Sequence, residues 1–521
     1  MYNHYNQFTH RYRKNLIADD TYHRDERFER EQRNVSFMKT RVPTKEKCMK
    51  ILQYFYSYLE ISSIHGLNHI AANKRNYFEN IFWSLIVLAG ALGAIHMSLS
   101  TWHRYQVMPT VISMERDYKE WNTSFPAVTI CPISKTDESS LEGIIGQEFP
   151  NEYNNDEMKE FIKELMNADY TTFSKIRAYE GIRSDKFLSI IDQAHENFSY
   201  SLSSSHSDVY GIMDMVKSMT ELGECYSFNS LVAVYNQISY WKSGKFSVVK
   251  QPEPFTGSPL DGDMFAQVMR MSSGYMLYIH GPYETFDIAS KVNYSPYMKY
   301  KTLELSALSI YSTAETRSLS IAQRKCRFVD ESNLKLAPIY TYKLCRMQCR
   351  MELAIQFCKC VPHFYRPQKG YKICDVHGMH CLGKHQDVLI KLRDPSRNDA
   401  KMPCNCLPPC DDIMYAIESE TSMEWFLGTN LKWGLVKYPR LRLKRDIIFG
   451  FTDLLVSIGG TAGLFLGCSV LSFIEFIYFF TLRAWFTWKK SSEKEINHSN
   501  WHLPSQAQKP IFVTSRSNFI D

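Results

Sequence analysis

The sequence lacks a strong excess of either charge. Its 61 lysine and arginine residues nearly balance 55 aspartate and glutamate residues, so the formal net charge is only +6 over 521 residues. A dedicated nucleic-acid-binding protein should be dominated by basic side chains. The composition therefore excludes nucleic acid as the main partner.

The sequence also lacks the common motifs of enzymes. It contains no HExxH, no G-x-S-x-G, no Walker loop and no G-x-G-x-x-G. His65 and His69 are four residues apart, but the glutamate of a zinc-protease helix is missing. A membrane-anchored enzyme is thus the weakest of the three functional classes that we weigh, and we expect no cofactor and no metal.

Two stretches have almost no charged residues. Residues 80–103 contain no Asp, Glu, Lys or Arg, and residues 447–482 contain only Asp453 and Glu475. About 20 apolar residues suffice to cross a bilayer. The first stretch starts too far from the N-terminus for a signal peptide, and runs of this length are rare in soluble cores. The sequence therefore predicts two membrane spans rather than buried core helices.

The cysteines indicate the compartment of the segment between the spans. Of 14 cysteines, Cys48 precedes the first span and Cys468 lies in the second. An even number confined to one segment is typical of disulfides in an oxidising environment. A zinc cluster is the alternative, but C-x-C pairs are too short for most zinc sites. The other twelve are Cys131, Cys225, Cys326, Cys345, Cys349, Cys358, Cys360, Cys374, Cys381, Cys404, Cys406 and Cys410.

Sequons and flanking charges give the orientation. Asn122, Asn197 and Asn293 begin N-x-S sequons, all between the spans, and are predicted glycosylation sites. Residues 1–79 carry 14 basic against 9 acidic side chains, and residues 483–521 carry 6 against 3. The positive-inside rule places both termini in the cytoplasm. We predict segments 1–79 (cytoplasmic), 80–103 (span), 104–446 (extracellular), 447–482 (span) and 483–521 (cytoplasmic).

Local patterns predict mixed α/β structure in the extracellular segment. We expect strands at 124–132, 275–280 and 301–312, and helices at 156–180 and 341–357. Cys345 and Cys349 share one face of the second helix because they are four residues apart. Residues 199–207 are polar and predict a loop, as does the Pro- and Gly-punctuated stretch 358–410.

The second span has unusual features for a simple anchor. As one straight helix its 36 residues would run about 54 Å, so it must extend beyond the bilayer, tilt or break. Gly459, Gly463 and Gly467 recur at every fourth position, a small-residue ridge that Leu471 and Glu475 continue. Simple helix packing is an equally good account of Gly459 and Gly463.

Glu475 and the tripeptide Gly467-Cys468-Ser469 are harder to explain as packing. A carboxylate within a span is costly and usually faces a polar path. Interrupted backbone at membrane depth is tolerated where it lines a water-filled cavity, and rings of carbonyls and carboxylates select cations. The second span therefore favours a cation pathway.

These motifs together resemble the degenerin/epithelial sodium channel family, which includes the acid-sensing channels. Residues 459–475 (GGTAGLFLGCSVLSFIE) resemble its second transmembrane signature, with a Gly-x-Ser filter at Gly467–Ser469. His65-Gly66 resembles its His-Gly pair before the first span. SFPAVTICP, GECYSFN, QRKCRF and CNCLPPC resemble its ectodomain motifs, and FTLR at 480–483 is similar to the insect pickpocket branch.

The resemblance implies a plasma-membrane trimer of two-span subunits, either a homotrimer or a heterotrimer with related subunits, surrounded by membrane lipid. Each ectodomain would have a β-rich palm, a helical finger and a disulfide-stapled thumb. The implied function is an amiloride-sensitive, voltage-independent sodium channel in sensory or epithelial transport. The opening stimulus stays open: acid, peptide, force, salt or pheromone.

The resemblance also implies roles for individual residues. Gly467, Cys468 and Ser469 would form the selectivity filter, and His65 with Gly66 would act in gating. Asp453 and Glu475 would raise the local cation concentration, and Gly459, Gly460 and Gly463 would allow close helix approach. The implied disulfides are Cys131–Cys225, Cys326–Cys410, Cys345–Cys406, Cys349–Cys404, Cys358–Cys381 and Cys360–Cys374.

One position departs from the family pattern. Three residues before Gly459 the family usually has Gly, Ala or Ser, and bulky substitutes there hold relatives open; this chain has Val456. We therefore predict a gating effect at Val456. A scavenger-receptor-like lipid-binding protein is the remaining alternative, since it too would have two spans and a disulfide-rich ectodomain. It needs neither the mid-span tripeptide nor Glu475, so the second span discriminates between the two.

Overall fold

The computed structural model describes residues 44–71, 76–117, 119, 121–136, 138–149, 156–194, 200–204, 215–393 and 404–489. Two compact units make up the chain. One comprises Met1–His103 with Phe451–Asp521, and the other comprises Arg104–Gly450. We call them the helical unit and the large unit. Asn197 and most of the predicted cytoplasmic segments lie outside the described residues.

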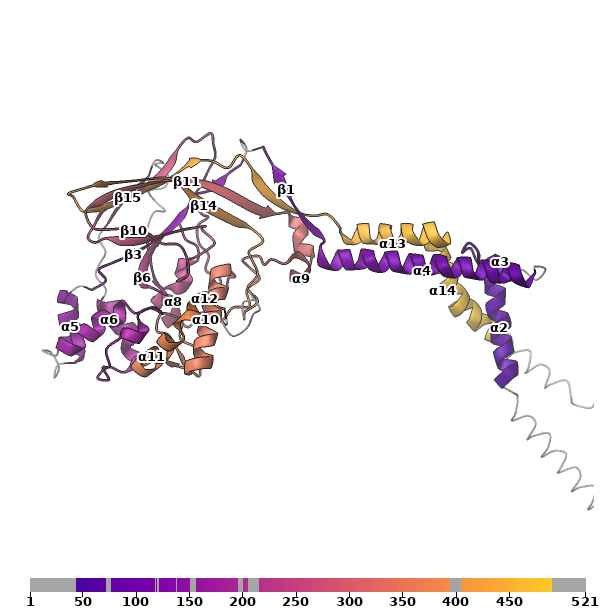
Figure 1. Cartoon of the computed structure of the whole chain (residues 1–521), viewed down its shortest axis with the longest axis horizontal. Coiled ribbons are helices and arrows are strands. Elements are labelled where there is room, and N and C mark those ends of the chain that lie inside the picture. The colour runs from indigo at the N-terminus through magenta and orange to yellow at the C-terminus, as the bar shows by residue number, and fades with distance from the viewer. Residues whose placement is uncertain are drawn as a thin grey trace, which may run out of the picture. The chain divides into compact units, whose positions relative to one another are not determined.

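The large unit is built on two sheets (Figure 1). The seven-stranded sheet has the order β1 (Thr110–Glu115), β16 (Arg442–Ile447), β11 (Lys299–Ser312), β15 (Thr429–Lys437), β8 (Met264–Met271) and β4 (Ser201–Ser204), with β14 (Asp412–Glu424) paired to β11. The five-stranded sheet has the order β10 (Asn293–Ser295), β9 (Tyr275–His280), β3 (Ala127–Pro132), β6 (Gly223–Phe228) and β5 (Val216–Thr220). Two-stranded pairs join β2 (Thr123–Ser124) to β7 (Thr256–Gly257) and β12 (Cys360–Val361) to β13 (Lys372–Ile373).

Helices of the large unit gather on one side of the sheets (Figure 1). They are α5 (Glu138–Glu148), α6 (Asp156–Met166), α7 (Phe187–Ala194), α8 (Ile238–Lys242), α10 (Tyr342–Cys358), α11 (Val376–Lys384) and α12 (Gln386–Lys391), with α9 (Ile321–Arg324) apart from them. Their apolar faces form the largest core cluster. A second cluster lies between the sheets around fully buried Trp433, with which Phe125 and Phe228 make ring contacts. All six residues of β3 are buried, as expected for a strand covered on both faces.

The predicted helix at 156–180 is too long. Helix α6 ends at Met166, and a 3-10 turn follows at Phe173–Lys175. The Asp169 carboxylate accepts hydrogen bonds from the N–H groups of Thr171 and Thr172, at 2.6 and 3.1 Å. A side chain that binds its own downstream backbone starts a turn in place of the helix.

The two predicted loops are also wrong in part. Residues 201–204 form strand β4, which pairs antiparallel with β8 at the edge of the sheet, where backbone hydrogen bonds suffice without an apolar face. Within 358–410, helices α11 and α12 are present. The Asp375 carboxylate caps α11 by accepting from the Gly378 N–H at 2.8 Å. Gly383 in α11 is a packing residue, because a Cβ there would lie 2.6 Å from the Ser174 nitrogen.

The helical unit contains α2 (Thr44–Ile61), α3 (Leu67–Ala71), α4 (Tyr77–Val107), α13 (Phe451–Leu466) and α14 (Val470–Tyr478). A π-helical turn at Phe479–Arg483 continues α14. Among the described residues, two helices are long and apolar enough to cross a membrane, Tyr77–Val107 and Val470–Lys489, and α13 is a shorter apolar helix. The predicted second span therefore differs in its bounds: Ile447 belongs to β16, and the helix continues to Lys489. Of the three geometries that its length allowed, it breaks.

Candidate functional site

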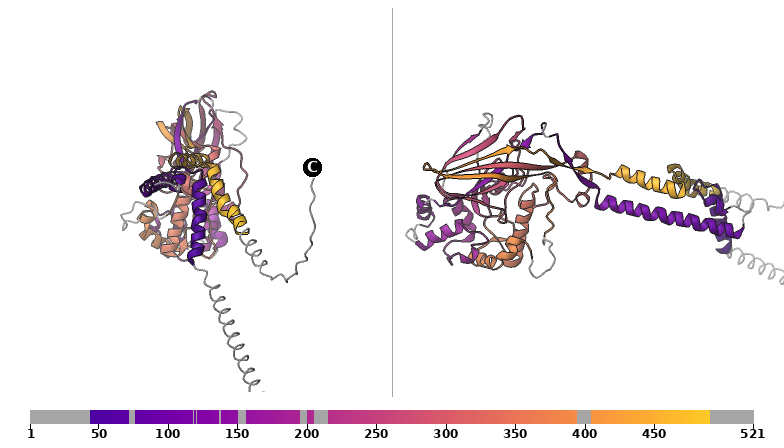
Figure 2. Two further views of the ribbon diagram at one scale, coloured as in Figure 1. Left: turned by 90° about the vertical axis from the view of Figure 1, so that its right-hand side faces the viewer. Right: turned by 45° about the horizontal axis from the view of Figure 1, so that its top comes forward.

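Helix α13 ends at a glycine, Gly467, whose backbone adopts a conformation that other residues rarely take. Gly467 has a φ of +62°, and its N–H donates to the Gly463 carbonyl at 2.9 Å. This is a left-handed C-cap, which favours glycine because a side chain would strain it. The Cys468 N–H also turns back, to the Ala462 carbonyl at 3.3 Å. Helix α14 then leaves in a new direction (Figure 2).

Ser469 starts the next helix. Its hydroxyl accepts from the Ser472 N–H at 3.2 Å, and the Ser472 hydroxyl accepts from the Ser469 N–H at 3.2 Å. The two serines therefore form a reciprocal capping box at the N-terminus of α14. Ser469 is exposed at the break, whereas Ser472 is buried. The predicted tripeptide Gly467–Ser469 is thus the whole interruption between the two helices.

The break changes the predicted small-residue ridge. Gly459 and Gly463 lie in α13, but Gly467 lies beyond its end, so Glu475 in α14 does not continue the same helical face. Asp453 is in the first turn of α13, and Glu475 is half-buried in α14. The two carboxylates therefore lie on opposite sides of the break along the chain.

The segment around His65-Gly66 contacts the break directly. The His65 N–H donates to the carbonyl of Leu466, the last residue of α13, at 3.0 Å. A Cβ on Gly467 would lie 1.8 Å from Nδ1 of His65. Gly66 has a φ of +90°, and a Cβ there would lie 2.6 Å from Val87 in α4. Two motifs from opposite ends of the sequence are therefore packed together, with no room for a larger residue at either glycine.

Helices α4 and α13 also approach closely beside the break (Figure 1). A Cβ on Gly90 would lie 3.1 Å from the Phe465 carbonyl oxygen, and a Cβ on Gly93 would lie 2.8 Å from the Phe465 ring. Because Gly90 and Gly93 have no side chains, Phe465 can pack directly against the backbone of α4. In contrast, a Cβ on Gly459 or Gly460 would meet nothing within 4 Å among the described residues, and Val456 is 72% exposed.

An aromatic cluster beyond the break was not predicted. Tyr58 of α2 lies 5.0 Å from the ring of Phe479 and 5.1 Å from that of Phe480. The Tyr54 hydroxyl donates to the Phe479 carbonyl at 2.7 Å, where the helix takes its π-helical turn. The sequence contained one signal for this cluster: Tyr54 and Tyr58 are four residues apart, which places both rings on one face of a helix. The cluster anchors the segment that carries His65 to the end of α14.

In the large unit, six disulfides join the same cysteine pairs that the family resemblance implies. Cys345 and Cys349 are in α10, and their partners Cys406 and Cys404 lie in the segment before β14. Cys131 and Cys225 connect neighbouring strands β3 and β6. Cys468 is a free thiol, and the side chain of Cys48 lies outside the described residues.

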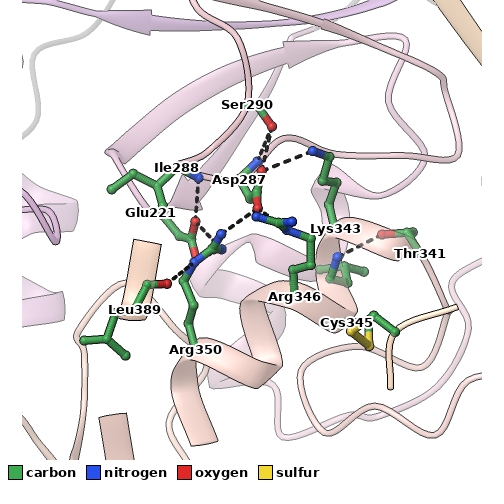
Figure 3. A network of polar contacts seen from close by, with 12 residues as sticks. Glu221, Asp287, Ile288, Ser290, Thr341, Lys343, Cys345, Arg346, Arg350 and Leu389 are labelled. Atoms are coloured by element: carbon green, nitrogen blue, oxygen red, sulfur yellow. Dashed lines mark hydrogen bonds and ion pairs between the residues drawn. A yellow bond between two sulfur atoms is a disulfide. The ribbon is translucent and has the colours of Figure 1, made fainter. Parts of the chain in front are cut away.

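A buried ionic network lies beside these disulfides (Figure 3). Arg350 of α10 is fully buried and donates to Glu221 at 2.9 Å, to Asp287 at 2.7 Å and to the Leu389 carbonyl at 2.9 Å. Asp287 also accepts from Arg346 at 2.8 Å. Burial alone would raise the pKa of Asp287, but the surrounding cations, Arg350 foremost, hold it well below its usual range.

The network was not predicted, although Arg346 and Arg350 are spaced to share one helical face. It connects α10 to the turn after β5 and to the loop after β9. Removing one partner would leave an uncompensated buried charge, which is strongly destabilising. The network therefore fixes α10 rigidly against the five-stranded sheet.

Two sequons fall on described residues. Asn122 is exposed. Asn293 is half-buried in β10, where its amide donates to Glu420 at 2.9 Å and its carbonyl accepts from Lys301 at 2.6 Å. Ser295 of the same sequon is fully buried. The three sites stay predictions, and Asn122 is the more accessible of the two described.

Comparison with known proteins identifies relatives along most of the chain. A family described as amiloride-sensitive sodium channel matches residues 58–479. Pickpocket protein 11 of Drosophila melanogaster is 23% identical over 461 residues, covering 83% of this chain and 77% of that protein. Sodium channel protein Nach of Drosophila ananassae is 21% identical over 508 residues, covering 87% and 93%. The bile acid-sensitive ion channel of Mus musculus is 24% identical over 466 residues, covering 81% and 87%.

Proposed function

The chain belongs to the amiloride-sensitive sodium channel family, and we propose that it is a pore-forming subunit of a sodium-selective, amiloride-sensitive channel. The family consists of ion channels, not enzymes, and the match does not favour a lipid-binding receptor. We propose further that the channel is voltage-independent and opens in response to a stimulus. The observation that carries the proposal is the interrupted helix at Gly467–Ser469, packed against His65-Gly66.

The selectivity filter is proposed at Gly467, Cys468 and Ser469. A helix break exposes backbone carbonyls at membrane depth, which is favourable only beside water or ions. The C-terminus of α13 adds the negative end of its helix dipole. Sodium would exchange part of its hydration shell for these oxygens, while Asp453 and Glu475 attract cations from either side.

Gating is proposed to act through the His65 segment. The hydrogen bond from His65 N–H to the Leu466 carbonyl fixes the last turn of α13. The His65 ring also packs so closely against Gly467 that neither can move far without moving the other. Movement of the segment would therefore be transmitted to the filter backbone. The Tyr54–Phe479 hydrogen bond supports the same coupling at the far end of α14.

The subunits are proposed to assemble as a trimer with copies of themselves or with related chains. The open space beside Gly459 and Gly460 supports this, because nothing within the described chain requires glycine there. Small residues on an exposed face allow close approach of another helix. We propose both termini in the cytoplasm and a plasma-membrane location, with the large unit outside.

Within the large unit we propose that the sheets form the palm, α5–α7 the finger and α10–α12 the thumb. Four disulfides have at least one cysteine in α10 or α11 or in the strands β12 and β13 between them. Together with the Arg350 network, these disulfides support the proposal that the thumb is a rigid lever. Such a lever would transmit a stimulus that acts on the proposed finger helices, α5–α7, to the membrane spans.

The test is expression in oocytes with sodium current recorded before and after amiloride. The proposal expects an amiloride-sensitive inward current, from the chain alone or with related subunits. No current in either condition, with the protein at the surface, would argue against a channel. A current blocked by amiloride but carried equally by sodium and potassium would retain the channel and reject the selectivity.

A further inference from the structure

A cavity of about 520 Å³ opens between helices α7 and α8 and the loop after β12. Leu188 and Ile238 are buried in its wall, and Trp241 and Phe246 complete the apolar surface. Its volume lies within the range of small-molecule sites, which are mainly apolar with a few placed polar groups. All lining residues belong to the large unit, so the site is complete within one chain.

The charged residues that line this cavity are all basic. Four cationic side chains line it and no acidic residue does; they are Lys242, Lys335, Arg366 and Lys369. Lys242 and Lys335 pair with Asp192 and Glu352 at 3.1 Å, but these pairs are largely exposed and therefore weak. The neighbouring cavity of similar size differs, since Glu180, Asp185 and Asp375 balance its cations. The excess of positive charge is thus a property of the first cavity.

Arg366 is held in place at the cavity wall. One Nη donates to the Lys245 carbonyl at 2.8 Å, and the guanidinium lies 5.4 Å from the Tyr240 ring and 5.1 Å from the Phe246 ring. Its other Nη is buried without a hydrogen-bond partner among the described residues. A buried donor without an acceptor is costly. Arg366 also lines the cavity, where a guanidinium can form charge-assisted hydrogen bonds with an oxyanion.

The segment beside Arg366, from Tyr235 to Ser247, is equally well defined. The Tyr240 hydroxyl donates to the Ser247 carbonyl at 3.0 Å, and the Trp241 indole N–H donates to the Tyr235 carbonyl at 2.8 Å. The indole thus has its polar group satisfied by the protein, so its contribution to the cavity is apolar. Fixed walls reduce the ordering cost of binding a ligand.

We propose that this cavity binds a small organic anion, in which a carboxylate or sulfonate is attached to an apolar ring system. The anionic group would lie beside Arg366 and Lys369, and the ring system would pack against Phe246 and Ile238. Because α7, α8 and the loop 366–369 each supply part of the wall, a bound ligand links these elements. The site is independent of the proposed pore.

The test is calorimetric titration of the full chain in lipid nanodiscs with naphthalene-1-sulfonate, with empty nanodiscs as the blank. We expect saturable binding of one ligand per chain. The neutral analogue 1-naphthalenemethanol should bind at least tenfold more weakly, and so should inorganic sulfate. Raising the salt concentration from 0.05 to 0.5 M should weaken sulfonate binding, since partly exposed charges are screened.

Substitutions locate the site. Lys369→Gln changes an exposed residue and should weaken sulfonate binding at least tenfold without loss of thermal stability. Arg366→Gln should do the same, with partial rescue in Arg366→Lys. Phe246→Ser, which alters a ring that is 49% exposed, should weaken the sulfonate but not bare sulfate. Lys372→Gln, in the neighbouring cavity, is the matched control and should bind as the wild type does.

Several results would overturn the proposal. Equal affinity for the sulfonate and the neutral analogue would reject an anion site, and equal affinity for bare sulfate would reject the apolar wall. Wild-type binding by both Lys369→Gln and Arg366→Gln would place the ligand elsewhere. Saturable binding of a hexaglutamate peptide without binding of the sulfonate would indicate an acidic peptide surface instead.

Discussion

Gly467 satisfies two constraints that no other residue can meet together. Its φ of +62° disfavours any side chain, and a Cβ would lie 1.8 Å from His65 Nδ1. We predict that Gly467→Ala reduces amiloride-sensitive current severely at unchanged surface expression, because the filter backbone and the His65 ring must both move. Gly143→Ala is the control, since a Cβ there meets nothing within 4 Å and alanine suits a helix.

The same contact predicts coupling between the two motifs. If the clash is the cause, the effects of Gly467→Ala and His65→Ala on open probability should not be additive, because His65→Ala removes the ring that the added Cβ would meet. A double-mutant cycle at matched surface expression measures this. Additive effects would show that His65 and Gly467 act independently and would contradict the proposed gate.

Glu224 in β6 gives a prediction for pH dependence. Burial raises its pKa to about 7, against the opposing effect of Lys217 at 3.0 Å. A folded-state pKa above the unfolded value of about 4.3 means that the folded protein binds the proton more tightly. This group's contribution is therefore fully present below about pH 4.3 and is lost as the pH rises to about 7.

Substitution isolates that contribution from other titrating groups. Glu224→Gln mimics the protonated acid, so the variant should come close to the wild type at pH 4 and exceed it in thermal stability at pH 8. The measurement is the difference in Tm between the two proteins at both pH values, with substitution of an exposed carboxylate, Glu304→Gln in β11, as the charge control. A difference that does not change with pH would refute the titration.

At the scale of elements, the sequence predicts some features well and others poorly. The length of the second span required an extension, tilt or break, and the glycine and serine at 467 and 469 indicated where a break could occur. The bounds could not be predicted, because apolar residues continue in sequence from Ile447, the last residue of β16, through α13 and α14. Helix α11 was missed because Gly378 and Gly383 look like helix breakers, whereas Gly383 fits against the Ser174 backbone.

The proposed effect of Val456 also belongs to the scale of elements, since it depends on how closely the α13 helices of different subunits approach one another. It is 72% exposed within one chain, so any crowding must come from another subunit. Valine is stiff at χ1, and overpacking typically costs about 1–3 kcal/mol. If only the closed state bears that cost, the open:closed ratio rises by about 5- to 150-fold, and the channel has a standing sodium leak.

The variant Val456→Ala tests the leak. Resting amiloride-sensitive current should fall relative to the wild type at matched surface expression. The alternative is that Ser457 and small residues of the first span compensate for the valine. Gly90 and Gly93, however, already pack against Phe465, more than two turns further along α13. Equal or larger resting current in Val456→Ala would favour compensation.

At the scale of the whole molecule, cysteine number and confinement to one segment predicted disulfides, but not their pairing. The pairing came from family resemblance, and the Arg350 network could not be foreseen because Glu221 and Asp287 are far from α10 in sequence. Long-range charge pairs leave no periodic signal in a sequence. The contact of His65 with Gly467 was likewise not predicted, since the resemblance implied only that His65 acts in gating.

The covalent framework is testable on the intact chain. We predict six disulfides, with Cys48 and Cys468 as the only free thiols, because the other twelve cysteines are paired in the structure. Peptide mapping without reduction, after alkylation of free thiols, identifies both classes. A third alkylated cysteine between residues 131 and 410, or zinc bound to the purified protein, would contradict the framework.

The filter assignment is tested most directly by the sodium-to-potassium permeability ratio of Ser469 variants, measured from reversal potentials. Because Ser469 also caps α14, Ser472→Ala is the matched control: it removes the reciprocal cap, with a helix cost of about 1 kcal/mol, but keeps the hydroxyl at the break. We predict that Ser469→Ala and Ser469→Cys either lose current or admit potassium, while Ser472→Ala keeps the wild-type ratio. Conducting Ser469→Ala and Ser469→Cys channels with unchanged sodium selectivity would contradict the assignment of Gly467–Ser469 as the selectivity filter.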